Sequence, residues 1–66
     1  MNSELDVKAI RQRTGFSQRQ FADLLGVSMS LVESWEQNRR KPSGSALKLL
    51  NVLDRKPDWK DVLLNA

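Results

Sequence analysis

The sequence has 66 residues with 11 Lys and Arg against 8 Asp and Glu, giving a formal net charge of +3, which fits one small domain with a polyanionic partner. It contains neither cysteine nor histidine, which excludes a disulfide framework, a thiolate zinc site and the commonest acid-base group of enzymes. No apolar run approaches the roughly 20 residues of a membrane span, and the polar, acidic N-terminus is unlike a secretory signal, so we expect a cytoplasmic protein with no membrane partner and no cofactor.

The chain predicts an all-α fold, a compact five-helix bundle in a single domain over residues 1–66. Few prolines and glycines interrupt it and β-branched runs are absent, which favours helices over strands. In the first predicted helix Ser3 is the N-cap, Asp6 at the third helical position acts as the capping-box acid, and Gly15 ends the helix. The inner side of this helix is expected to carry Leu5 or Val7, Ile10 and Thr14.

The organising stretch is residues 17–37, which predict two short helices joined at a glycine corner. Ser17 caps the first of them, and Gln20 follows at the spacing of a capping box. Gly26 ends this helix, since glycine adopts the left-handed conformation without a Cβ clash. Ser28 caps the second helix. Two hydrophobic staples are expected, Phe16 with Phe21 and Val27 with Val32.

Apolar and polar positions separate on these two helices. The apolar stripe of the first is Phe21, Leu24 and Leu25. On the second, Val32 and Trp35 are expected to turn inward. The residues predicted to face outward are Ser28, Met29, Ser30, Glu33, Ser34 and Gln37. The second helix therefore presents a small, mostly uncharged polar surface, in the layout of a helix-turn-helix whose second helix enters the major groove of DNA.

Three consecutive cations, Arg39, Arg40 and Lys41, follow this second helix. Asn38 before them is expected to take the left-handed conformation that ends the helix, and Pro42 prevents the helix from continuing. A run of charges is usually a solvated surface. A loop that leaves a recognition helix, however, passes the phosphates at the edge of the groove, so we expect phosphate contacts here.

Two further helices complete the predicted bundle. Ser43 caps the fourth, which runs over about residues 45–54 and closes the core against the third helix. Its apolar face is Ala46, Leu47, Leu49, Leu50 and Leu53. Pro57 is well placed as the first residue of a fifth short helix. The apolar residues of that helix are Trp59, Val62 and Leu63.

The residues also resemble a known family. The string Ser-Gln-x-x-Phe-Ala-x-x-Leu-Gly-Val-Ser, followed by Val-x-x-Trp-Glu-x-x-x-Arg-x-Pro-Ser-Gly, is similar to the phage-repressor and Cro type of helix-turn-helix, the XRE-like group, and within it to HigA-like antitoxins. The resemblance covers roughly residues 7–53. It implies a lambda-repressor-like bundle, an ion pair between Arg11 and Glu36, and a phosphate contact for Gln18.

We therefore predict a sequence-specific DNA-binding transcriptional regulator, a repressor that binds operator DNA in the major groove. The residues expected at the phosphate backbone are Gln18, Arg19, Arg39, Arg40 and Lys41. Asn38 beside them is also expected to contact DNA. The residues expected at the base edges are Ser28, Met29, Ser30 and Ser34, with Glu33 and Gln37 at the margin. Met29 stands where phage repressors carry a glutamine and offers a contact to a thymine methyl group. Serines discriminate weakly between bases, so no operator sequence follows, and DNA shape is expected to contribute to readout.

One domain of this kind covers half a binding site, and a homodimer places two recognition helices about 34 Å apart. The residues expected at the dimer surface are Trp59, Leu63 and Leu64, with Trp59 equally consistent with a place in the core. A sharper prediction is an antitoxin that represses its own operon and binds a cognate toxin.

The alternative is a protein-interaction module that kept the fold and lost DNA binding. An enzyme is not expected, because the chain lacks a glycine-rich phosphate loop and its carboxylates are scattered. These expectations imply a cytoplasmic protein that is associated with the nucleoid.

Overall fold

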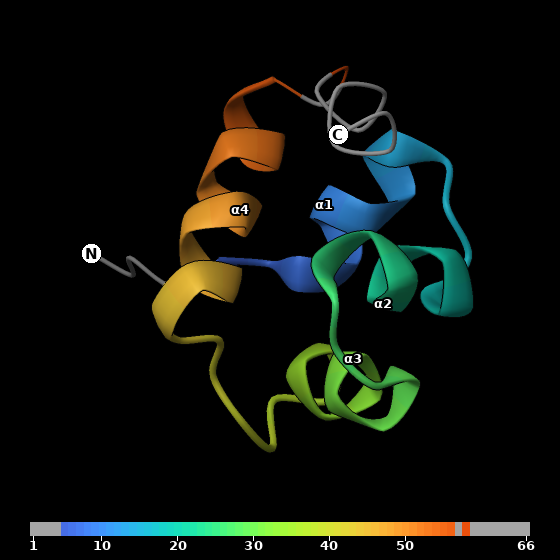
Figure 1. Cartoon of the computed structure of the whole chain (residues 1–66), viewed down its shortest axis with the longest axis vertical. Coiled ribbons are helices and arrows are strands. Elements are labelled where there is room, and N and C mark those ends of the chain that lie inside the picture. Colours follow the sequence, from blue (N-terminus) through green and yellow to red (C-terminus); the bar gives the residue numbers. More distant parts are fainter. Residues whose placement is uncertain (1–4, 57, 59–66) are drawn as a thin grey trace.

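The computed structural model describes residues 5–56 and Asp58, and this part of the chain contains four helices and no strand. The helices are α1 (Val7–Thr14), α2 (Gln18–Leu25), α3 (Met29–Glu36) and α4 (Gly44–Arg55). The all-helical prediction is confirmed. In Figure 1, α3 lies at the bottom of the molecule, with α4 to the left and α2 to the right. The predicted fifth helix, the Ser3 cap and the expected dimer residues Trp59, Leu63 and Leu64 lie outside the described residues.

Helix α1 begins one residue after Asp6, whose side chain is the N-cap. The Asp6 Oδ1 atom accepts a hydrogen bond from the Ala9 amide at 3.0 Å, with the Asp6 backbone extended. The prediction that Asp6 lies at the third helical position was therefore wrong. A short carboxylate on extended backbone reaches the amide three residues ahead, which is what an N-cap does. The predicted end at Gly15 is confirmed by its left-handed φ of 81°.

Helices α2 and α3 are joined at the predicted glycine corner. Gly26 is left-handed, with φ of 71°. Its amide donates to the Asp23 carbonyl at 3.3 Å, and the Val27 amide donates to the Ala22 carbonyl at 3.0 Å. These two bonds form a Schellman motif, in which the orphan carbonyls at the helix end are satisfied by the turn. Ala22 is buried in the core, and Val27 packs against that core.

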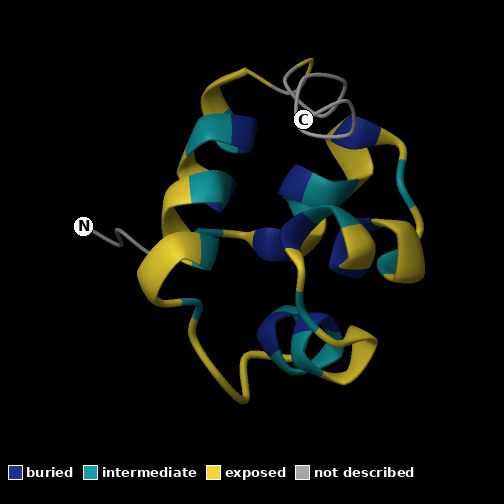
Figure 2. Cartoon of the chain, in the orientation of Figure 1, coloured by how far each residue is buried: buried dark blue, intermediate teal, exposed yellow. Residues whose placement is uncertain are grey.

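The core lies where the inner faces of all four helices meet, as the dark blue segments of Figure 2 show. Its members are Val7, Ile10, Phe21, Ala22, Leu25, Val32, Trp35, Leu50 and Leu53. Helix α1 contacts both α3 and α4, and α2 contacts α3. The burial of Val32 and Trp35 confirms the predicted inner side of α3, and the burial of Phe21 and Leu25 confirms most of the stripe on α2.

Helix α4 departs from the prediction at its start and on one side. It begins at Gly44, and Ser43 holds the N-cap position without a side-chain capping bond. Leu47 was predicted to be on the apolar face, but it is 36% exposed, whereas Leu50 and Leu53 are fully buried. Helix α4 packs on α1, and this docking centres the buried stripe away from Leu47.

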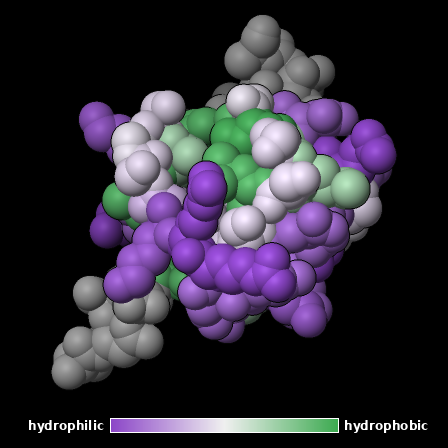
Figure 3. Space-filling view, turned by 90° about the horizontal axis from the view of Figure 1, so that it is seen from below, coloured by the Kyte–Doolittle hydropathy of each residue, from purple (hydrophilic) through white to green (hydrophobic). Residues whose placement is uncertain are grey.

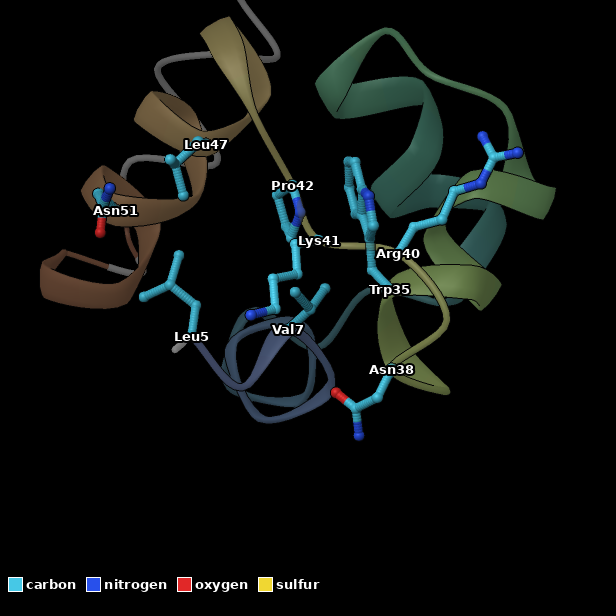
Figure 4. A pocket seen from close by; sticks show the side chains of 9 residues that line it. All are labelled: Leu5, Val7, Trp35, Asn38, Arg40, Lys41, Pro42, Leu47 and Asn51. Carbon is cyan, nitrogen blue, oxygen red and sulfur yellow. The ribbon is translucent and has the colours of Figure 1, made fainter. Parts of the chain in front are cut away.

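Leu47 instead lines a surface groove of about 260 Å³, next to the core residues Val7 and Trp35. Figure 4 shows Leu5 and Val7 on the same groove, with Trp35 at its other side. Among the described residues, no helix is long and apolar enough to cross a membrane.

Candidate nucleic-acid interface

Helix α3 separates an inner side from an outer one. The Ser28 hydroxyl accepts a hydrogen bond from the Leu31 amide at 3.1 Å and so caps the helix as predicted. Val32 is fully buried on the inner side. Met29 and Ser30 are exposed on the outer side, as the sequence predicted. The first turn of α3 therefore presents one flexible apolar side chain and small hydroxyls to the surroundings.

The remaining outward positions of α3 are less open than the pattern suggested. Glu33 and Ser34 are half-buried, whereas Gln37 just beyond the helix is exposed. Ser28, Ser30 and Ser34 share a shallow recess with Leu31 and Arg40. The sequence reasoning did not connect Arg40 with this side of α3, because the connection depends on how the chain turns after the helix.

That turn is a second Schellman motif. Asn38 is left-handed, with φ of 61°, as predicted. Its amide donates to the Trp35 carbonyl at 3.2 Å, and the Arg39 amide donates to the Ser34 carbonyl at 2.8 Å. The Arg40 amide also reaches the Ser34 carbonyl, at 3.4 Å. The turn thus folds the start of the cationic segment back against the last turn of α3.

The side chains that leave this turn are exposed. Every residue from Gln37 to Lys41 is exposed. Seen from the side on which α3 and this loop lie, strongly hydrophilic surface borders a pale and apolar area (Figure 3). Cations suit the phosphates of a nucleic acid, and small, uncrowded side chains leave room to reach the base edges in its grooves.

The first turn of α2 contributes a second part of the candidate surface. The predicted capping box is confirmed, because the Gln20 amide donates to the Ser17 hydroxyl at 3.1 Å and the Gln20 side chain accepts from the Ser17 amide at 2.9 Å. Arg19 is exposed, and Gln18 is half-buried.

Gln18 is tied to α3. Its Nε2 atom donates to Glu36 Oε1 at 3.1 Å. The sequence reasoning placed Gln18 at a phosphate and missed this bond, since the two residues are far apart in the sequence. One of the two N–H groups on that amide is used by Glu36, and the other remains for a partner outside the molecule.

Glu36 also forms the ion pair that the family resemblance implied. Its two carboxylate oxygens accept from Arg11, Oε2 from Nε at 2.6 Å and Oε1 from Nη2 at 3.2 Å. The Arg11 and Glu36 side chains are only 15% and 5% exposed. Arg11 Nη1 donates in addition to the Phe16 carbonyl at 3.0 Å. Arg11 is therefore a tether between helices, as predicted, and the start of α2 and the end of α3 are joined through one carboxylate.

Titration of this pair follows from its contacts. Burial raises the pKa of Glu36, but the hydrogen bonds from Arg11 and Gln18 and the positive charges of Arg11 and Lys8 outweigh burial and leave that pKa below its usual value. The hydrogen bond to Glu36 raises the pKa of Arg11. Both groups are thus held in their charged forms at neutral pH.

Within the described part of the chain, no group of three His, Cys, Asp or Glu side chains is placed to hold a metal ion. The predicted site residues instead fall into two neighbouring sets on the surface. The first turn of α2 carries Gln18 and Arg19. Helix α3 and the turn after it carry Ser28, Met29, Ser30, Glu33, Ser34, Gln37, Asn38, Arg39, Arg40 and Lys41.

Residues 7–60 match a sequence model of the helix-turn-helix family. The chain is 38% identical over 52 residues to YiaG of Escherichia coli K12, described as an uncharacterized transcriptional regulator of the helix-turn-helix type; the match covers 79% of this chain and 54% of that relative. It is 38% identical over 53 residues to antitoxin HigA-2 of Vibrio cholerae, covering 80% of this chain and 51% of the antitoxin. The chain spans about half the length of these curated relatives.

Proposed function

The chain belongs to the XRE-type helix-turn-helix family, and on this premise we propose that it is a sequence-specific DNA-binding transcriptional regulator that acts as a repressor. The observation that carries the proposal is the division of α3. Val32 and Trp35 fix its inner side in the core, whereas Met29 and Ser30 are exposed next to a cationic turn. A helix presented in this way fits the major groove, with its N-terminal residues toward the base edges.

Affinity in the proposed complex comes from cations at the phosphates. Arg19 at the start of α2 and Arg39 in the turn after α3 are both exposed and supply these charges. For each phosphate that they neutralise, the logarithm of the binding constant falls by about 0.9 when the logarithm of the salt concentration rises by one unit. Gln18 adds a neutral phosphate contact through the amide hydrogen that Glu36 does not use.

Specificity in the proposed complex comes from the outer side of α3. Ser28, Ser30 and Ser34 donate or accept at either kind of base pair, and Met29 packs on a thymine methyl group. Glu33, Gln37 and Asn38 lie at the margin of this set. We further propose that two copies bind a palindromic operator, with recognition helices about 34 Å apart, and that Trp59, Leu63 and Leu64 form the dimer surface.

Fluorescence anisotropy with a labelled duplex of random sequence, about two helical turns long, tests the DNA-binding part of the proposal. The expected result is binding at about 50 mM salt that weakens linearly on a log-log plot up to about 200 mM. A chain that binds no duplex at the lower salt concentration is instead the protein-interaction module that keeps the fold without the DNA function.

A second candidate function, an antitoxin that represses its own operon, is supported by the similarity to antitoxin HigA-2. In that case a small toxin is encoded in the neighbouring reading frame. Expression of that frame alone is expected to arrest growth, and co-expression of this chain is expected to relieve the arrest through a stable complex. Growth arrest that this chain does not relieve would overturn the antitoxin proposal and leave the DNA-binding proposal in place.

A further inference from the structure

The three consecutive cations after α3 do not extend in the same direction. In Figure 4 the Lys41 side chain extends across the groove toward Leu5 and Val7, whereas the Arg40 side chain extends the opposite way, over α3. Arg40 shares a recess of about 260 Å³ with Ser28, Ser30, Leu31 and Ser34. The sequence assigned both Arg40 and Lys41 to the phosphates. Their side chains extend in different directions, although both line the groove beside Leu47.

The backbone explains this direction. The Arg39 and Arg40 amides both donate to the Ser34 carbonyl, at 2.8 Å and 3.4 Å. Two successive residues are thus held against the last turn of α3, after the left-handed Asn38 has reversed the chain. The Cα atom of Arg40 is therefore anchored beside the recognition helix, and its long side chain runs back along the serine-bearing side.

The chemistry of this recess suits a base edge. The guanidinium group is a planar fork whose parallel N–H donors match two acceptors side by side. Serines leave the space beside it open, because their side chains are short. In the major groove, the O6 and N7 atoms of guanine present such a pair of acceptors.

From this placement we propose that Arg40 is a specificity-determining residue that donates both N–H groups of its guanidinium to the O6 and N7 atoms of one guanine in each half-site. The proposal rests on the proposed DNA-binding function and deepens it. Serine hydroxyls and a methionine discriminate weakly between bases, and Arg40 supplies the strong directional contact that this set lacks.

Arg40→Lys is the decisive variant, because it keeps the positive charge and removes the fork. Arg55→Lys is the matched control, because Arg55 is an exposed arginine at the end of α4, outside the proposed DNA-binding surface. Each protein first selects its preferred sites from a random duplex library. Affinity is then measured by anisotropy for the selected duplex, for the same duplex with the fixed G·C pair changed to A·T, and for one with 7-deazaguanine at that position.

The wild-type protein and Arg55→Lys are expected to fix one guanine per half-site and to lose about 5- to 150-fold in affinity when that base pair is changed, the range that a bidentate contact supports. Both are expected to lose affinity for the 7-deazaguanine duplex, which lacks the N7 acceptor. Arg40→Lys is expected to keep the salt dependence of the wild type but to discriminate among the three duplexes far less strongly, because an ammonium group lacks the planar fork that matches O6 and N7.

The proposal is overturned if Arg40→Lys keeps the full wild-type preference for the guanine, since a preference that survives loss of the planar fork does not come from a bidentate guanidinium contact. It is also overturned if the wild-type protein binds duplexes without preferring a guanine, an outcome that leaves non-specific DNA binding intact. Absence of binding to every duplex at low salt overturns the proposed function itself, so the two failures are distinguishable.

Discussion

The corner after α2 and the corner after α3 have the same type of backbone turn, but the residue that follows the turn is apolar at the first corner and charged at the second. Each is a Schellman motif around one left-handed residue, Gly26 in the first and Asn38 in the second. At the first corner the next residue is Val27, which packs on the core; at the second it is Arg39, which is exposed. The turn sets the path of the chain, and the residue just past it decides whether the turn closes the core or presents charge to a partner.

Glu36 links the two ends of this arrangement. It lies in the last turn of α3, before the second corner, and it binds Gln18 at the start of α2 and Arg11 on α1. The angle between α2 and α3 therefore depends on one carboxylate as well as on the apolar first corner.

The largest effect is expected from Glu36→Gln, which lowers the free energy of unfolding by about 3 kcal/mol because it leaves the Arg11 guanidinium without a counter-charge in a site with little solvent. Urea denaturation measures the change. The matched control is Asp54→Asn, which removes the ion pair between Asp54 and Arg13. The Arg13 and Asp54 side chains are 51% and 39% exposed, so the loss is expected to be less than about 1 kcal/mol. Equal losses in the two variants would mean that burial of the Glu36 pair does not matter.

A smaller loss is expected from Gly26→Ala. A Cβ at this position meets no atom within 4 Å, so the penalty comes from the left-handed backbone alone and amounts to about 1–2 kcal/mol. Thermal unfolding followed by circular dichroism is the measurement. An unchanged midpoint would show that the first corner relaxes without cost and does not hold α2 against α3.

The pH dependence of stability is expected to report on Glu36. Since the pKa of Glu36 is lower in the folded protein than its usual value of 4.5, its contribution to stability is present above that value and is lost as the pH falls through the lower, folded-state pKa. Urea denaturation across this acidic range is expected to show the loss in the wild type and a smaller one in Glu36→Gln. Parallel pH profiles would assign acid sensitivity to other carboxylates.

The smallest effect, and the opposite sign from Gly26→Ala, is expected from Asn38→Gly. Glycine removes the Cβ strain at φ of 61° but adds freedom to the unfolded chain, so stability rises by less than about 1 kcal/mol. Denaturation measured beside Gly26→Ala checks the sign. A clear loss of stability would show that the asparagine side chain itself supports the second corner.

Local features of this fold were predictable from the sequence because they depend on residues a few positions apart. The capping box at Ser17, the left-handed Gly26 and Asn38, and the inward turn of Val32 and Trp35 all follow from spacing within one or two turns. The family resemblance supplied one long-range contact, the pair between Arg11 and Glu36.

Features set by packing between helices were not predictable in the same way. Helical periodicity gave Leu47 a place on the apolar side of α4, but the docking of α4 on α1 left it exposed. Asp6 was predicted to lie at the third helical position of α1, whereas it is the N-cap. The bond from Gln18 to Glu36 and the direction of Arg40 depend on where α3 ends in space, which no local pattern specifies.

We propose that the first turn of α2, the outer side of α3 and the second corner form one DNA-binding surface. Titration of the isotopically labelled protein with a short duplex, followed by amide chemical shifts, tests it residue by residue. We expect the largest changes in amide chemical shift in residues 18–20, 28–34 and 37–41, and no change on the exposed side of α4. Shifts concentrated on the groove beside Leu47, or no shifts at low salt, would contradict it.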